Sequence, residues 1–269
     1  MRLSLGGTYM VKTELKRAFF SKAFWITCTI AFVMLAIGGT DYINYAVHPS
    51  KGIVSTWWEA YIVSLTFGMT CLLSLFYPII VMIPYVLSYR RERDSGYRQL
   101  ILLKTSRRAY LGAKMLAVAV SAFASMLLPN LCWMLVCRLA LGETDPAYEY
   151  FRHMIDFALP LYDSHPGWYM VMYAVHASVL GAIFAIAGLG LSTVIKNRYL
   201  ALLLPFCYCV FSGAVLVYLD SGFAAFYLLP IQSYRFSAIG YWGIPLYEAV
   251  LLTVGLGLFL GGDYHAGKA

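Results

Sequence analysis

Six long apolar runs are the feature that most restricts how this chain can fold. They cover approximately residues 20–40, 61–88, 112–138, 168–195, 200–219 and 245–262. A helix needs about 20 apolar residues to cross the roughly 30 Å hydrocarbon core of a bilayer, and every run is near or above that length. The chain is 61% hydrophobic and 12% charged, so residues 1–269 are predicted to form a single all-α polytopic transmembrane domain with six transmembrane helices.

Lysine and arginine are distributed unevenly over the connections between these runs. With six spans, sixteen of the twenty fall on the side that holds both termini, and four fall on the other side. Because cations next to a span are translocated poorly, both termini of this multi-pass protein are expected in the cytoplasm, with the spans in the cell (plasma) membrane. The net charge of +7 therefore reflects topology, and no nucleic-acid partner is expected.

Residues 8–22, before the first run, place apolar side chains at helical spacing among basic ones. This pattern predicts an amphipathic helix in the plane of the lipid headgroups, with an ordinary basic membrane anchor as the alternative. The stretch from Gly6 to Thr13 is similar to a phosphate-binding loop, but Val11 stands where a glycine is needed for close approach to phosphate. No nucleotide or other cofactor is therefore expected to bind this chain.

The most charged connection, residues 89–114, contains eight lysines and arginines and joins the second and third runs. Asp94-Ser95-Gly96 predicts a helix stop followed by a cap, and Thr105-Ser106 predicts a new cap before the third span. A short helix of about eight residues, about 12 Å long, is expected between them, with an apolar side from Leu100 to Leu103. A strut attached at both ends to membrane helices can transmit a push from a cytoplasmic partner to those helices.

This connection and the stretch before the first run resemble the permease subunits of bacterial type-2 ABC exporters. The resemblance rests on the order and approximate spacing of Glu92, Asp94, Gly96, Leu100–Leu103, Ser106, Arg107 and Lys114, and on Glu14, Leu15, Lys16 and Arg17 for the interfacial helix. The chain departs from the family pattern at Thr105, where proline is common, and at Tyr97, where threonine is common.

The resemblance implies that residues 89–110 contain a coupling helix and that Glu92, Asp94 and their neighbours dock into a groove of a separate ATP-binding subunit. The coupling residues it implies are Glu92, Arg93, Asp94, Ser95, Gly96, Tyr97, Arg98, Leu100, Ser106 and Arg107. Two ATP-binding subunits, which carry ATP and magnesium, and a second permease copy, identical or related, are the implied partners beside the lipid bilayer. The chain itself is then a transport subunit and not an enzyme.

The implied substrate path runs mainly between the second and fifth spans. His176, Pro78 and Phe206 are its candidate lining residues, although a hydrogen bond from His176 to a neighbour is an alternative role for that side chain. The 22 tyrosines and 16 phenylalanines favour a peptide, antibiotic or lipid-like cargo. Residues 220–245 are too apolar for a solvated loop and too broken for a span, so short re-entrant-like helices are expected there.

Two other classes of function are open. A secondary transporter or channel usually needs buried acids, and Glu59, Glu248 and Arg138 lie near outer span ends, where snorkelling to the interface accounts for them. A membrane-embedded enzyme needs nucleophilic and ionisable residues that converge inside the spans, and these are scarce. In the fourth run a stripe of small residues that includes Gly181 predicts a close helix approach, either within the chain or with a second copy.

Overall fold

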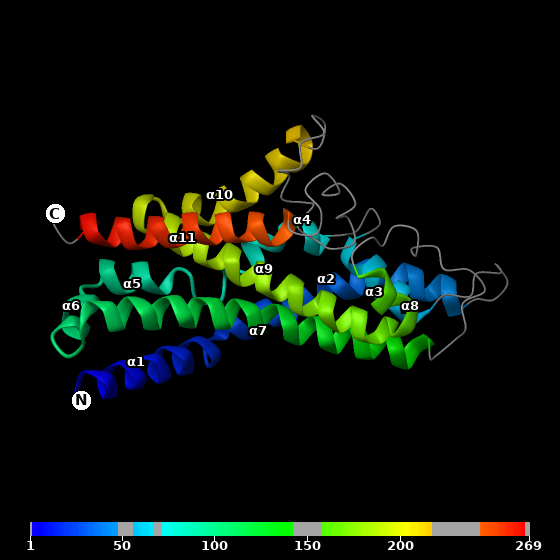
Figure 1. The fold of residues 1–269 in the computed structure, drawn as a ribbon, viewed down its shortest axis with the longest axis horizontal. Helices are drawn as coiled ribbons and strands as arrows, with labels where there is room; N and C mark the ends of the chain where they lie inside the picture. The colour runs from blue at the N-terminus through cyan, green and yellow to red at the C-terminus, as the bar shows by residue number, and fades with distance from the viewer. Residues whose placement is uncertain (1, 48–55, 67–71, 142–157, 217–242, 267–269) are drawn as a thin grey trace.

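The computed structural model describes residues 2–47, 56–66, 72–141, 158–216 and 243–266, and every regular element in these ranges is a helix (Figure 1). The helices are α1 (Arg2–Phe19), α2 (Lys22–Val47), α3 (Trp57–Thr66), α4 (Leu72–Ile80), α5 (Ser88–Asp94), α6 (Tyr97–Leu102), α7 (Arg107–Leu141), α8 (Leu159–Ser164), α9 (Pro166–Val194), α10 (Arg198–Phe211), the π-helix η3 (Ser212–Leu216) and α11 (Gly243–Ala266). They form one elongated bundle. The start of α1, the end of α11, and α5 and α6 lie at one end, whereas α3 and α8 lie at the other.

Four of these helices are long and apolar enough to cross a membrane, which indicates a membrane-embedded protein. They are α2 over Lys22–Thr40, α7, α9, and α11 over Gly243–Tyr264. The other two predicted spans differ from the expectation. The second is divided among several shorter elements, and α10 has 14 residues before it passes into η3. The expected re-entrant-like helices at 220–245 fall almost entirely outside the described residues.

The second run is interrupted at residues 81–87, which form turns in place of a regular helix. Met82 N and Ile83 N donate to carbonyls three residues back, over 3.1 and 3.2 Å. Pro84 has no N–H with which to continue the α-helical ladder to the Ile80 carbonyl, so the helix ends there. Pro129, by contrast, lies inside α7, which runs without interruption from Arg107 to Leu141.

The helix α9 lies at the centre of the bundle, and its small residues are used inside the chain. Gly181 lies against Tyr77 and Met126, and a Cβ added at Gly181 would come within 2.8 Å of the Tyr77 hydroxyl. On another side, a Cβ at Gly255 of α11 would lie 2.9 Å from the backbone of Ala187. These close approaches show that the small-residue stripe packs against helices of the same chain, in agreement with one of the two predicted alternatives.

Candidate functional site

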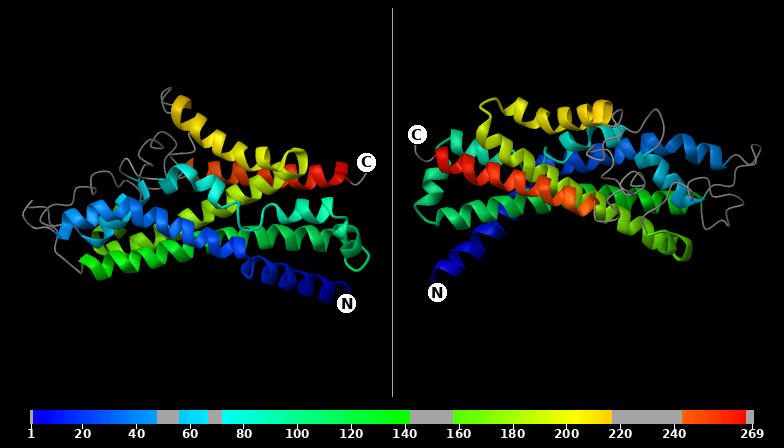
Figure 2. Two further views of the ribbon diagram at one scale, coloured as in Figure 1. Left: turned by 180° about the vertical axis from the view of Figure 1, so that it is seen from behind. Right: turned by 45° about the horizontal axis from the view of Figure 1, so that its top comes forward.

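The charged end of the bundle is built where α1, α5, α6, α7 and α11 meet. Helix α1 packs along the first part of α7 and leaves the axis of α2 at an angle (Figure 2). It ends at Phe19 because Ser21 begins the next helix, its Oγ accepting from Phe24 N over 3.1 Å. Residues 8–19 of the stretch expected to form an amphipathic helix lie in α1, which buries the face that carries Met10, Glu14 and Ala18. Its position in the headgroup plane stays a prediction.

The first buried group of charges, called here the Lys114 cluster, joins α1, α5 and α7. It consists of Glu14, Arg17, Tyr85, Glu92, Tyr110 and Lys114. The Lys114 ammonium has no solvent exposure and pairs with both Glu14 and Glu92, at 2.9 Å from Glu92 Oε2. Arg17 pairs with the same two carboxylates, over 2.9 Å to Glu14 and 2.7 Å to Glu92. The cluster thus contains two carboxylates and two cations, and its formal charge is balanced.

Tyrosine hydroxyls complete the hydrogen bonding of this cluster. Tyr85 donates to Glu14 Oε2 over 2.8 Å, and Tyr110 donates to Glu92 Oε2 over 2.7 Å. The Lys114 ammonium also lies over the Tyr85 ring, 4.8 Å from its centroid. Each buried carboxylate therefore accepts several hydrogen bonds from cations and hydroxyls, as a charge removed from water requires.

The second group, called here the Asp263 cluster, joins α5, α6, α7 and α11. It consists of Tyr89, Arg98, Arg107 and Asp263. The fully buried Asp263 carboxylate pairs with both arginines, accepts from Arg107 Nε over 2.6 Å and accepts from the Tyr89 hydroxyl over 2.5 Å. Burial, together with this hydrogen bond to Asp263, raises the pKa of the Tyr89 hydroxyl above its ordinary value, so the hydroxyl remains a donor.

Helix α5 lies between the two clusters and connects them. It contributes Glu92 to one and Tyr89 to the other, and the rings of Tyr89 and Tyr110 are 6.4 Å apart. It also contacts the C-terminal end of α9, where Arg90 donates to the carbonyls of Ile195, over 2.5 Å, and of Lys196. Cations at the C-terminal end of a helix satisfy its last carbonyls and interact favourably with its dipole.

The predicted helix breaks on either side of α6 are present. Gly96 has φ 72°, a left-handed conformation that favours glycine, and α6 follows it directly. The Ser106 hydroxyl accepts from Ala109 N over 3.3 Å and so caps α7 as expected. Two details differ: α6 has six residues and not about eight, and the Ser95 hydroxyl donates back to the Glu92 carbonyl instead of capping α6.

The outer face of α6 is apolar and exposed. Tyr97 and Leu100 are about half exposed, and Leu103, just after the helix, is 82% exposed. The polar neighbours Asp94 and Ser106 are also exposed. Exposed apolar faces of this kind mark surfaces that contact another protein or a membrane.

The Glu92 carboxylate, which was expected to dock into a partner, is bound inside the bundle in this structure. Glu92 is 4% exposed, and both of its oxygens bind cations or hydroxyls of this chain. Arg98 is buried as well and is bound to Asp263. The physical reason is that α5 turns its acidic face toward α7, where Lys114 supplies a buried countercharge. Asp94 remains on the exposed side.

The residues predicted to line a path fall into two places. Phe206 of α10 stacks on Phe76 of α4, with ring centroids 5.6 Å apart, and Pro78 is buried in the same helix α4. His176 of α9 instead faces α11, where its Nε2 lies 3.4 Å from Glu248 Oε1. Pro78 and Phe206 therefore lie on two neighbouring helices, α4 and α10. His176 lies elsewhere, beside Glu248 of α11.

Snorkelling does not account for the two acids that it was expected to explain. Glu59 is 1% exposed and accepts a hydrogen bond from the Tyr42 hydroxyl over 3.1 Å. Glu248 is largely buried against His176. Arg138, in contrast, is exposed at the end of α7.

Sequence reasoning did not assign a role to Asp263, which holds the second cluster together. The sequence feature that could have indicated this role is the position of Asp263 near the end of an otherwise apolar helix, on the side of the membrane where cations predominate. Such an acid needs cationic partners when it is buried, and two arginines of 89–110 are those partners.

Comparisons of the chain with protein-family models, with curated proteins and with solved structures found no match.

Proposed function

We propose that this chain is the membrane subunit of an exporter of the type-2 ABC class and that α6 is its coupling helix. The observation that carries the proposal is the attachment of α6: its outer face is apolar and exposed, while its inner side is fixed by Arg98 to Asp263. A force applied to α6 from outside the bundle would act on α7 and α11 through buried ion pairs. The charged end is cytoplasmic in this proposal, in agreement with the distribution of lysine and arginine.

The Lys114 cluster provides a second connection between α6 and the rest of the bundle. Because α5 precedes α6 directly, a displacement of α6 also moves Glu92, and Glu92 shares Lys114 with Glu14 of α1. Arg17 extends this connection, since its guanidinium lies 5.7 Å from the Tyr97 ring centroid of α6. The short helix is thus linked to α1, α7 and α11, the elements that two permease copies would have to rearrange between inward and outward access.

A matched pair of substitutions tests the docking surface. Leu103→Asp places a charge on the exposed face next to α6, and Leu139→Asp places the same charge at an equally exposed position, 77%, at the other end of α7. Affinity-tagged protein from native membranes is assayed for magnesium-dependent ATP hydrolysis that co-purifies with it. We expect Leu103→Asp to lose most of this activity and Leu139→Asp to retain it; equal activity in both variants would count against the proposal.

A cation-coupled secondary transporter is the second candidate, and the buried acids favour it. Glu59 and the pair of His176 and Glu248 are ionisable groups within the apolar part of the bundle, where such residues usually serve transport. Transport by proteoliposomes that contain the chain alone, driven by an ion gradient without ATP, would support this candidate and contradict the first.

A further inference from the structure

The acids of the charged end are bound inside the bundle. Glu14, Glu92 and Asp263 are buried in the two clusters, where each pairs with cations of this chain. Asp94 is exposed, but one of its oxygens lies 3.4 Å from Arg90 Nε. The carboxylates of this end therefore already have cationic partners.

Three exposed cations next to α6 have no such partner among the described residues. They are Arg91 of α5, Lys104 just after α6 and Arg108 in the first turn of α7. The ion pairs that the described residues form at this end use other cations, namely Arg17, Arg90, Arg93, Arg98, Arg107 and Lys114. The cations that flank α6 along the chain therefore remain available to another molecule.

The charge of this surface is determined by described residues, because the chain connections at this end lie within the described ranges. They are the turns that follow α1, α5, α6 and α9. The chain ends, residues 1–6 and 265–269, contribute no aspartate or glutamate side chain. The surface around α6 is therefore cationic.

The apolar residues of α6 continue into this cationic surface. Tyr97, Leu100 and Lys104 follow one another at the spacing of a single helix face, and all three are exposed. Leu103, next to Lys104, is the most exposed of the apolar residues here. An apolar centre with a polar rim is the usual anatomy of a protein–protein interface.

Helix α7 is long enough to carry α6 away from the hydrocarbon. Its 35 residues span about 50 Å, roughly 20 Å more than the hydrocarbon core. The buried ion pairs lie at the first turns of α7, so this end is the one that extends beyond the core, and α6 lies at its tip (Figure 1). A protein in the aqueous phase therefore fits the exposed face of α6 better than the acyl chains of the bilayer.

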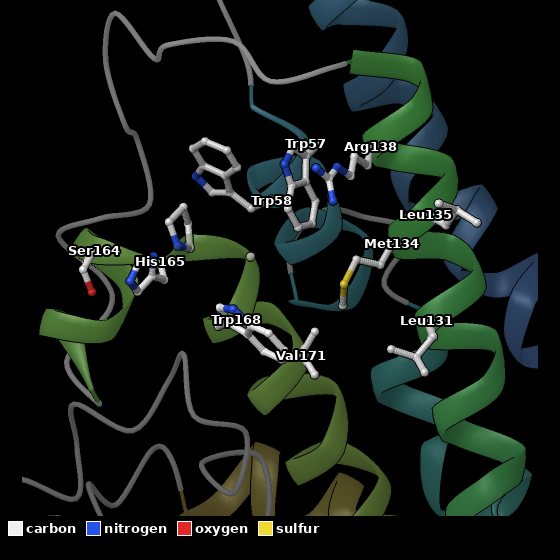
Figure 3. Close-up of a pocket in the computed structure, with 12 residues that line it drawn as sticks. Trp57, Trp58, Leu131, Met134, Leu135, Arg138, Ser164, His165, Trp168 and Val171 are labelled. Atoms are coloured by element: carbon white, nitrogen blue, oxygen red, sulfur yellow. The ribbon is translucent and has the colours of Figure 1, made fainter.

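The two ends of the bundle also differ in shape. At the end opposite α6, a tryptophan-lined pocket of about 680 Å³ lies between the start of α3, the last turns of α7 and the junction of α8 with α9 (Figure 3). Trp57, Trp58 and Trp168 contribute to its lining. In contrast, α6 is a short helix at the tip with exposed side chains, so it is suited to enter the groove of a larger partner.

We propose that the surface around α6 docks onto an acidic partner, in a groove with an apolar floor and a rim of aspartate and glutamate. The proposal rests on the proposed function, in which α6 couples to an ATP-binding subunit, and it adds the sign of that subunit's charge. Docking through the Glu92 carboxylate would require a cationic groove. Because Glu92 is buried beside Lys114, the charges that face the partner are those of Arg91, Lys104 and Arg108.

The experiment uses the whole chain in native membrane vesicles, with p-benzoylphenylalanine in place of the exposed Leu100. After brief illumination, the cross-linked peptides are mapped by mass spectrometry. We expect adducts with one protein, on a segment rich in aspartate and glutamate. The yield should fall about ten-fold when the salt concentration is raised from about 0.05 M to about 0.5 M, because exposed charges act mainly on association and are screened by salt.

Charge variants test which cations take part. Neutralising all three cations, by Arg91→Gln, Lys104→Gln and Arg108→Gln together, should lower the yield about ten-fold. The charge-conserving set Arg91→Lys, Lys104→Arg and Arg108→Lys should retain the yield. The matched control neutralises three exposed lysines of α1 and α2 at the same end of the bundle, Lys12, Lys16 and Lys22, and should leave the yield unchanged.

A pair of substitutions at one position tests the sign of the partner's charge. Leu103→Lys and Leu103→Asp remove the same apolar side chain and add opposite charges. Next to an acidic rim, the lysine variant should give a several-fold higher yield than the aspartate variant. An equal or higher yield with Leu103→Asp would overturn the acidic docking surface; if the cross-linked protein nevertheless hydrolyses ATP, the proposed function would stand.

The remaining outcomes are equally decisive. Adducts with phospholipid in place of protein, no adduct at all, or an unchanged yield after neutralisation of the three cations would overturn the docking surface. Charge-dependent adducts on an acidic segment of a protein that does not hydrolyse ATP would support the docking surface and contradict the proposed function.

Discussion

The two halves of the bundle are held together by different chemistry. At the charged end, buried carboxylates of α1, α5 and α11 bind cations of α1, α6 and α7. Toward the end that carries the tryptophan-lined pocket, the contacts between helices include hydrogen bonds between uncharged side chains, beside the acids Glu59 and Glu248. The Tyr61 hydroxyl donates to Asn130 Oδ1 over 2.9 Å, and Trp133 Nε1 donates to the Ser64 hydroxyl over 2.7 Å.

The length of α7 explains this division. Its 35 residues span about 50 Å, roughly 20 Å more than the hydrocarbon core of a bilayer, so one end can extend into the headgroup region. Charges there can exchange their partners for water during a conformational change, whereas charges at the centre of the bilayer cannot do so without a large cost. The charged end is therefore suited to move, and the other half, which contains fewer buried charges, is suited to remain fixed.

The largest effect that tests this difference is expected at Lys114. Lys114→Met keeps the length of the side chain but leaves the buried Glu14 and Glu92 carboxylates with one shared cation, Arg17, in place of two. The free energy of unfolding, measured by denaturant titration in bicelles, should fall by about 3–5 kcal/mol.

The control for Lys114 is Lys104→Met, an exposed lysine just after α6. It should change stability by less than about 0.5 kcal/mol. Adding Glu14→Gln to Lys114→Met should recover part of the loss, because one uncompensated buried charge is removed. Equal stability of the two lysine variants would show that the cluster does not hold the charged end together.

The next effect is expected at Asp263. Asp263→Asn leaves Arg98 and Arg107 without their common carboxylate, and a loss of about 2 kcal/mol is expected. Hydrogen exchange should show the distinctive result: faster exchange in residues 97–102, with residues 166–194 unchanged. Asp94→Asn, whose carboxylate is exposed, is the control. If exchange rises equally throughout both segments, Asp263 stabilises the whole bundle and does not act specifically on α6.

Local features of the charged end could be predicted from the sequence because they depend on neighbouring residues. Gly96 and Ser106 mark the ends of helices through backbone preference and capping, and both act as predicted. The apolar face of α6 was also predicted from spacing. In contrast, the pairing of Glu92 with Lys114, 22 residues away, depends on how α5 folds back onto α7. Residue types alone do not specify that orientation.

The same limit explains the errors in the spans and acids. Hydropathy shows that a run is apolar, but it does not show where Pro84 divides it into shorter elements. Glu59 was placed at a span end by its position in the sequence, yet Tyr42 of another helix provides a buried hydrogen-bond partner for it. A contact between helices determined the burial of Glu59, whereas the break in the second run follows from the missing N–H of Pro84.

A smaller effect is expected at the hydrogen bond between Ser64 and Trp133, at the other end of the bundle. Ser64→Ala removes the hydroxyl that accepts from Trp133 and leaves the indole N–H unpaired, for a loss of about 1 kcal/mol. Ser121→Ala is matched to it, since Ser121 is also buried but donates only within its own helix. Stability should therefore hardly change in that variant. A Ser64 effect as large as that of Lys114 would remove the contrast between the two halves.

The smallest effect is expected where the charged end meets α9. Arg90 donates to two carbonyls just after α9 and pairs with Asp94, whereas the adjacent Arg91 is exposed, so the two positions differ in their contacts and not in charge. Arg90→Gln should cost about 0.5 kcal/mol and speed hydrogen exchange only around residues 191–196, while Arg91→Gln should do neither. Exchange that increases along the whole of α9 would contradict this prediction, because it would mean that α5 stabilises the entire helix and not only its last turn.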